Sequence, residues 1–196
     1  MPQPDLAGST PDRQAIAALA RRIDRPLVLV GLMGVGKTSV GKRLAAVLGF
    51  EFVDADEAIE EAAQMAIPEI FETYGEPYFR SGERRVIARL IEEAHARPGK
   101  VIATGGGAFV DPETRALILE RAVAIWLDAD LDTLVDRVGR RTNRPLLKDG
   151  NPREILARLK AEREPAYAEA PIHIASRGGP HQRTVATIIK ELEAWR

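Results

Sequence analysis

The sequence predicts an α/β domain of three layers, in which helices cover both faces of a parallel β-sheet. Short apolar runs alternate along the chain with longer segments of helical periodicity, a pattern typical of repeated strand–helix units. The apolar runs are nearly continuous, as strands that are buried on both faces require. A chain of 196 residues is long enough for one such domain with a short appendage.

The elements follow in order along the chain. The strand candidates are the apolar runs at 26–31, 50–54, 100–103, 122–127 and 171–175. The helix candidates lie at about 37–48, 56–64, 67–74, 77–96, 112–120, 130–139, 152–169 and 181–195. Two of these helices have clear start signals, because Asp111 and Asn151 are capping residues that directly precede a proline, and Glu154 completes a capping box.

The first 25 residues are expected to form an appendage to a domain that spans residues 26–196. Residues 1–10 have the composition of a tail without regular structure. Residues 11–25 predict a short amphipathic helix that packs on the outside of the domain. Its apolar side chains are Ile16, Leu19 and Ile23.

Composition excludes several classes of protein. Lys and Arg (28) nearly balance Asp and Glu (29), so the net charge of −1 disfavours bulk electrostatic binding to nucleic acid. The chain has no cysteine, which removes disulfides, thiolate nucleophiles and Cys-based zinc sites. The apolar runs are too short to cross a membrane, and residues 1–25 lack the apolar core of a secretory signal. We therefore expect a cytoplasmic protein with no membrane or nucleic-acid partner, and a monomer by default.

A glycine-rich motif with the pattern G-x-x-x-x-G-K-T occupies Gly31–Thr38, between the first predicted strand and the first helix of the domain. Glycines allow such a loop to turn its backbone N–H groups toward a phosphate chain, at the positive end of the following helix. Lys37 is expected to reach the β- and γ-phosphates of ATP, and the Thr38 hydroxyl to ligate Mg²⁺. The predicted ATP contacts are Gly34, Val35, Gly36, Lys37, Thr38 and Ser39.

Two acidic residues could supply the carboxylate that accompanies Mg²⁺ in such sites. Asp54 and Asp128 both end apolar strands, and Asp54 is favoured because its strand directly follows the glycine-rich loop and its helix. Asp56 lies two residues farther on and could reach a substrate. The alternative for Asp56 is a plain N-cap of the helix at 56–64.

Two further motifs each have a functional and a plain structural interpretation. Arg80 and Glu83 share a helix face, either as part of a binding site or as an exposed ion pair. The three glycines Gly105–Gly107 follow the strand at 100–103, where the sheet opens to ligands. They would let the backbone approach a bound molecule closely, although a flexible turn is the alternative.

A cationic stretch runs from Arg137 to Arg163 and surrounds a segment without periodicity at 139–150. We expect that segment to be a mobile lid, in which Arg141 and Arg144 close over the triphosphate and exclude water. The three histidines, His95, His173 and His181, have no metal-binding spacing and are interpreted as structural.

Taken together, these motifs resemble those of the shikimate kinases. The shared order is the glycine-rich loop, Asp-x-Asp, Phe-Arg-x-x-Glu, Gly-Gly-Gly, Arg-Pro-Leu-Leu and Arg-x-Pro-x-Tyr, and the resemblance covers about residues 26–190. It implies a P-loop kinase fold like that of nucleoside monophosphate kinases, with a five-stranded parallel sheet. It also implies transfer of the γ-phosphate of ATP to the 3-hydroxyl of shikimate, on the route to chorismate and the aromatic amino acids.

The resemblance also implies roles for individual residues. Lys37, Asp56 and Arg144 would be catalytic, and Asp54 would hold Mg²⁺ through water beside Thr38. Arg141 would pack on adenine, and Arg177 and Pro180 would belong to the adenine-side loop. The substrate would be bound from a helical segment at about 55–83, from the glycines and from a later arginine: Asp56, Ile67, Phe71, Phe79, Arg80, Glu83, Gly105, Gly106, Gly107 and Arg163.

Two other functions remain open from the sequence. A related small-molecule kinase that acts on another polyol acid, such as gluconate, would share the phosphate-binding loop. A regulatory module that binds nucleotide or shikimate without turnover would share the fold, although the presence of Lys37 and Asp56 speaks against it.

Overall fold

The computed structural model describes residues 13–139, 151–176 and 179–195, and within them the predicted parallel sheet is confirmed. Five strands hydrogen-bond in the order β2-β3-β1-β4-β5, with every neighbouring pair parallel. The strands are β1 (Leu27–Val30), β2 (Glu51–Asp54), β3 (Lys100–Ala103), β4 (Val123–Asp128) and β5 (Ile172–Ala175).

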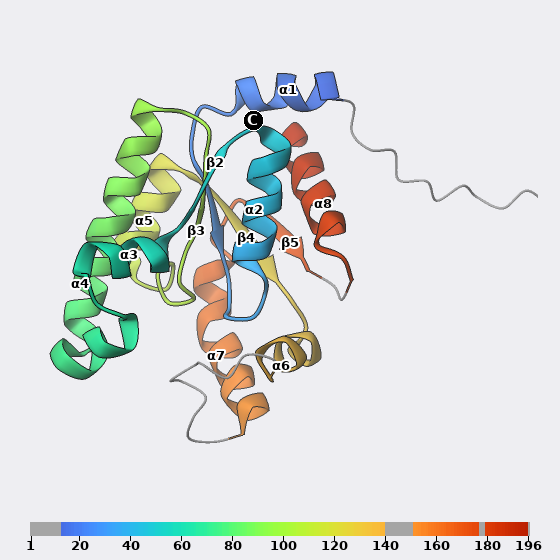
Figure 1. Cartoon of the computed structure of the whole chain (residues 1–196). Coiled ribbons are helices and arrows are strands. Elements are labelled where there is room, and N and C mark those ends of the chain that lie inside the picture. The colour runs from blue at the N-terminus through green and yellow to red at the C-terminus, as the bar shows by residue number, and fades with distance from the viewer. Residues whose placement is uncertain (1–12, 140–150, 177–178, 196) are drawn as a thin grey trace, which may run out of the picture.

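Helices cover both faces of this sheet (Figure 1). Helices α2 (Lys37–Leu48) and α8 (His181–Ala194) pack against each other on one face. On the other face, α5 (Pro112–Arg121) packs on β4 and the long α4 (Ile67–Ala96) packs on α5. The remaining helices of the domain are α3 (Ala55–Ala63), α6 (Leu131–Gly139) and α7 (Pro152–Tyr167).

The core of the molecule is centred on β1, whose four residues are completely buried. Burial of each such side chain contributes about 1.5–3 kcal/mol relative to exposure. Burial is lower at the sheet edges, since β2 is partly exposed and β5 alternates between buried and exposed residues. The central strand is therefore the most firmly packed part of the sheet, and the glycine-rich loop begins where it ends.

The helix boundaries agree with the sequence expectations to within a few residues. Asp111 caps α5 by accepting a hydrogen bond from the Thr114 N–H, and Asn151 caps α7 in the same way from the Arg153 N–H. The helices expected at 67–74 and 77–96 are joined into α4, but Gly75 has non-helical angles (φ 79°, ψ 172°) that kink it. A left-handed φ of this kind favours glycine.

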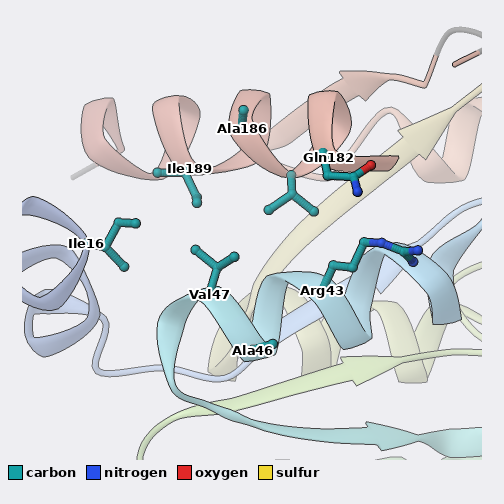
Figure 2. Close-up of a pocket in the computed structure, with 8 residues that line it drawn as sticks. Ile16, Arg43, Ala46, Val47, Gln182, Ala186 and Ile189 are labelled. Atoms are coloured by element: carbon teal, nitrogen blue, oxygen red, sulfur yellow. The ribbon is translucent and has the colours of Figure 1, made fainter. Parts of the chain in front are cut away.

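The short helix expected within residues 11–25 is α1 (Arg13–Arg22), which packs against α2. Its Leu19 is buried in the main core, and Ile16 and Ile23 pack against that core. Figure 2 shows Ile16 beside Val47 of α2 and Ile189 of α8, which line an apolar groove of about 350 Å³. None of the predicted ATP, metal or substrate residues lines this groove, so it is separate from the candidate site.

Among the described residues, no helix combines the length and the apolar character that a membrane span requires. Of the lid predicted at 139–150, residues 140–150, with Arg141 and Arg144, lie outside the described residues, and so does Arg177.

Candidate active site

The candidate site lies at the edge of the sheet where the parallel strands end, which is the usual ligand-binding edge of this architecture. We distinguish a donor side, formed by Gly31–Ser39, from an acceptor side. The acceptor side comprises Asp56, Arg80, Glu83, Gly105–Gly107 and Arg163.

The donor side is a tight loop between β1 and α2. Gly31, Gly34 and Gly36 all have positive φ (132°, 85° and 101°), a conformation that L side chains rarely adopt. A Cβ atom at Gly31 would also fall against the backbone carbonyl oxygen of Leu127. The loop therefore requires glycine for its shape, and the N-terminus of α2 follows directly, with the positive end of its dipole at the loop.

The side chain of Lys37 is held inside this loop. Its ammonium group donates to the carbonyl oxygens of Gly31 (2.7 Å) and Leu32 (3.1 Å), and the residue is only 9% exposed. The lysine is thus fixed at the mouth of the loop, where the sequence pattern predicts contact with phosphate.

Asp54 and Asp128 have different partners in the structure. The Thr38 hydroxyl donates to a carboxylate oxygen of Asp54 at 2.8 Å, whereas Asp128 forms an ion pair with Lys160. Asp54 also caps α3 by accepting from the Asp56 N–H, so the N-cap interpretation of Asp56 is wrong.

A hydroxyl beside a carboxylate is a donor set that suits Mg²⁺, which prefers oxygen ligands and keeps several waters. Thr38 and Asp54 provide this pair. Within the part of the chain that the structure describes, no group of three or more His, Cys, Asp and Glu side chains could hold a metal ion. A Mg²⁺ ion at this site would therefore rely on nucleotide phosphates and water for its other ligands.

The acceptor side begins with Asp56 in the first turn of α3. Burial raises the pKa of its carboxyl above the ordinary value, and the nearby charge of Asp54 raises it further. Lys37 and Arg80 act in the opposite direction. A Cβ at Gly106 would lie 3.7 Å from the Gly31 carbonyl oxygen, so the donor and acceptor sides adjoin.

Arg80 on α4 lies between two glutamates. Its guanidinium donates to Glu83 (2.7 Å) and to Glu76 (3.0 Å and 3.2 Å), and it lies over the ring of Phe79 at 5.2 Å. Glu83 is only 2% exposed, and its burial raises the pKa of the carboxyl even though Arg80 counteracts this. The i,i+3 ion pair considered from the sequence is therefore present, but its exposed placement is wrong. Glu83 is a buried partner that orients Arg80.

The three glycines make room for the charged side chains around them. A Cβ at Gly105 would lie 2.7 Å from a carboxylate oxygen of Asp56, and one at Gly107 would lie 2.6 Å from the guanidinium nitrogens of Arg80. A Cβ at Gly106 would lie between Met33 N of the donor side (3.3 Å) and Arg163 Nη1 (3.5 Å). Glycine is thus needed here for space around these groups, which a flexible turn would not explain.

The last cation of the acceptor side comes from α7, where Arg163 Nη1 donates to the Gly106 carbonyl oxygen at 3.1 Å. The structure therefore brings together Asp56, Arg80, Glu83 and Arg163 around Gly105–Gly107. These groups come from four separate segments of the chain.

The predicted apolar residues occupy the neighbouring helix. The rings of Phe71 and Phe79 are in contact, with centroids 4.5 Å apart. Because the Phe79 ring also contacts the Arg80 guanidinium, it connects Phe71 to the acceptor side. Ile67 is the first residue of α4 and packs against the core.

Three residues near the site were given no functional role from the sequence. Arg137 on α6 donates to the Val35 carbonyl oxygen of the loop at 2.8 Å, although the sequence showed it only as one of several cations. His181 follows the predicted Pro180, and its ring would lie 3.1 Å from a Cβ at Gly36. Burial lowers the pKa of His181, and Arg137 and Arg43 lower it further. Tyr167, the third, donates its hydroxyl proton to the Gly106 carbonyl oxygen.

Fold and site together define a P-loop phosphotransferase, with a phosphate-binding loop facing a cluster suited to a small anionic acceptor. The family model for shikimate kinase matches residues 33–193. The chain belongs to the shikimate kinase family.

Similar proteins support this assignment. A shikimate kinase of Novosphingobium aromaticivorans is 66% identical over 180 residues, which is 92% of this chain and 93% of that protein. A shikimate kinase of Zymomonas mobilis is 51% identical over 168 residues, covering 86% of this chain and 93% of the relative. The solved shikimate kinase of Acinetobacter baumannii, in complex with shikimate, has a TM-score of 0.81 at 35% identity, covering 89% and 97% of the two chains.

A gluconokinase from Sinorhizobium meliloti is also similar in structure, with a TM-score of 0.58 over 88% of this chain and 93% of that one. Its sequence identity of 16% supports a common fold and nothing further.

Proposed function

We propose that this chain transfers the γ-phosphate of ATP to the 3-hydroxyl of shikimate, giving shikimate 3-phosphate in the biosynthesis of chorismate and the aromatic amino acids. The observation that carries the proposal is the convergence of Asp56, Arg80 and Arg163 around Gly105–Gly107, beside the phosphate-binding loop. The solved relative that contains shikimate has the same fold, and the family assignment is independent of this geometry.

On the acceptor side, we assign the substrate carboxylate to Arg80 and Arg163. Planar guanidinium groups bind carboxylates in a fixed, bidentate geometry, which a flexible ammonium group does not match. Glu83 holds Arg80 in place. We assign the ring hydroxyls of shikimate to Asp56 and to the backbone of Gly105–Gly107. Ile67, Phe71 and Phe79 would contact the apolar side of the ring.

Asp56 is also the candidate to orient the 3-hydroxyl and to accept its proton. A general base works best when its pKa approaches the working pH. The pKa of Asp56 is raised, which brings it closer to neutral pH. Phosphoryl transfer passes through a loose transition state, so the proton is accepted late. Positioning of the hydroxyl therefore contributes more to catalysis than removal of its proton.

On the donor side, Lys37 and the backbone N–H groups of Gly34–Ser39 would bind the triphosphate. Mg²⁺ at Thr38 and Asp54 would neutralise phosphate charge. Arg144 of the lid is assigned to the transferring phosphate, Arg141 to adenine, and Arg177 with Pro180 to the adenine-side loop. These assignments follow from the motif order, since the arginines lie outside the described residues.

The catalytic domain is proposed to span residues 26–196, with residues 1–25 as an appendage that docks through α1. We further propose that the enzyme is a cytoplasmic monomer.

The test is a coupled assay of ADP release with ATP and Mg²⁺, in which shikimate, gluconate or no acceptor is supplied. We expect turnover with shikimate alone. Turnover with gluconate and none with shikimate would establish the alternative kinase. Nucleotide binding without turnover of either acceptor would establish a regulatory module.

A further inference from the structure

Three side chains on one face of α7 reach the functional edge of the sheet. Lys160, Arg163 and Tyr167 are spaced three and four residues apart, which places them in a line along the helix. Lys160 pairs with Asp128 at the end of β4, while Arg163 and Tyr167 both donate to the carbonyl oxygen of Gly106. The proposed function uses Arg163 and leaves Tyr167 without a role.

The ring of Tyr167 is firmly held. The residue is 3% exposed, and its ring centroid lies 6.0 Å from that of Trp126. Trp126 in turn stacks on His173 with a centroid distance of 3.9 Å. Burial raises the pKa of Tyr167 to about 12, so its hydroxyl stays protonated, and able to donate, at every working pH. A donor fixed in this way keeps its partner, the Gly106 peptide, in one position.

The Gly106 carbonyl oxygen has two donors in this structure, and a carbonyl oxygen has two lone pairs to receive them. The proposed function requires the Arg163 guanidinium to bind the substrate carboxylate. If Arg163 turns to the substrate, Gly106 loses one donor. The Gly106 carbonyl is partly buried, so the loss of both donors would be unfavourable, and the Tyr167 hydroxyl prevents that loss.

We propose that Tyr167 is a positioning residue for the acceptor substrate, which fixes the Gly106 peptide and thereby releases Arg163 to bind the substrate carboxylate. This inference rests on the proposed function. Tyr167 acts through Gly106 and Arg163 and needs no contact with the reacting atoms.

The first test compares Tyr167→Phe with the unsubstituted enzyme in steady-state kinetics. We expect the KM for shikimate to rise about fivefold, the typical effect of one lost hydrogen bond, with kcat and the KM for ATP within about twofold. Tyr74→Phe is the matched control, because Tyr74 is 52% exposed and its ring contacts only that of Tyr78 among the ring pairs described. It should change none of these constants. An unchanged KM for shikimate, or an equal rise for both substrates, would overturn the inference.

The second test places the same change in an Arg163→Ala background. Because Tyr167 acts through Arg163, Tyr167→Phe should lower kcat/KM for shikimate by less than about twofold there. The full fivefold effect in that background would contradict the proposal. Different results would refute the proposed function and the role of Tyr167. An unsubstituted enzyme without shikimate turnover refutes the proposed function, whereas turnover with an unaffected Tyr167→Phe variant refutes only this inference.

A third measurement uses the unsubstituted chain and so does not depend on the folding of Tyr167→Phe. Incorporation of 3-fluorotyrosine at the three tyrosines gives ¹⁹F resonances, and Tyr74→Phe and Tyr78→Phe assign the remaining one to Tyr167. Saturating shikimate without nucleotide should shift the Tyr167 resonance, since Arg163 leaves the carbonyl that they share. A resonance that stays in place would contradict the proposal.

Discussion

The donor and acceptor sides of the site are built in opposite ways. The donor side is a single stretch of nine residues, Gly31–Ser39, whose shape depends on backbone conformation and on three glycines with positive φ. The acceptor side gathers side chains from α3, from α4, from the loop after β3 and from α7. Its glycines provide space for those side chains.

This difference has a consequence for mutagenesis. On the donor side, backbone shape and phosphate binding are inseparable, so substitutions should affect both stability and turnover. On the acceptor side, charged groups are held by other side chains, as Arg80 is held by Glu76 and Glu83. Apart from Asp56, whose proposed role is catalytic, substitutions there should mainly change the affinity for shikimate.

The largest effect is expected from Lys37→Met on the donor side. Loss of the ammonium group removes a positive charge from the transferring phosphate, and kcat should fall by about 10³-fold. The KM for shikimate should change little. Steady-state ADP release at saturating ATP measures both constants. A kcat within tenfold of the unsubstituted enzyme would show that Lys37 is not the phosphate-binding group.

Asp56→Asn should have the next largest effect. The amide keeps the size of the side chain but cannot accept the hydroxyl proton, so kcat should fall by about 10²-fold. The profile of kcat against pH should lose its acidic limb, which the raised pKa of Asp56 places above the ordinary aspartate range. Near-full turnover with unchanged affinity for shikimate would refute the role of Asp56.

A matched pair of glycine substitutions compares the two sides directly. Gly31→Ala forces a Cβ against the Leu127 carbonyl at a φ of 132°, and it should cost about 2–4 kcal/mol of unfolding free energy. Gly107→Ala meets only the end of the Arg80 side chain, which can shift where a backbone carbonyl cannot, so it should cost less, about 1 kcal/mol or below. It should instead raise the KM for shikimate about tenfold by displacing the guanidinium group from the substrate carboxylate.

Thermal unfolding and steady-state kinetics on both variants check this pair. Equal loss of stability in the two variants would show that Gly107 is needed for the backbone, and the contrast between the sides would then be wrong.

The smallest effect concerns the stability of the free enzyme. Because the pKa of Asp56 is raised in the folded state, the folded chain binds more protons than the unfolded one once the pH exceeds the ordinary value of 3.8. Stability is therefore lost as the pH rises through the interval between the two pKa values. Asp56→Asn should stabilise the protein by about 0.5–2 kcal/mol at neutral pH and by nothing near pH 3. Denaturant unfolding at the two pH values measures this, and a destabilised variant at neutral pH would contradict it.

The sequence predicted the donor side well because its signals are local. The glycine pattern, the preceding apolar run and the following helix lie within a single stretch, and all five predicted strands are present. The capping signals at Asp111 and Asn151 also depend on neighbouring residues, and both are confirmed. The break at residue 75 was predictable because glycine and proline interrupt the helical pattern there.

The acceptor side was predicted only through the resemblance to a known family. Local patterns left Asp56 and the Arg80–Glu83 pair undecided, because burial decides their roles and burial arises from tertiary packing. The contact of Arg137 with Val35 and that of Tyr167 with Gly106 join segments 102 and 61 residues apart. The four-residue spacing of Arg163 and Tyr167 indicates a shared helix face, but nothing in the sequence identifies the carbonyl that both contact.

The most direct test of the two-sided site is calorimetric titration of shikimate into nucleotide-free protein, for the unsubstituted chain, Lys37→Met and Arg80→Met. If residues far from the phosphate-binding loop define the acceptor, Lys37→Met should bind shikimate within about fivefold of the unsubstituted Kd. Arg80→Met should weaken binding by about 10²-fold, since it loses a charge-assisted bidentate contact. Loss of binding in Lys37→Met together with normal binding in Arg80→Met would contradict the account.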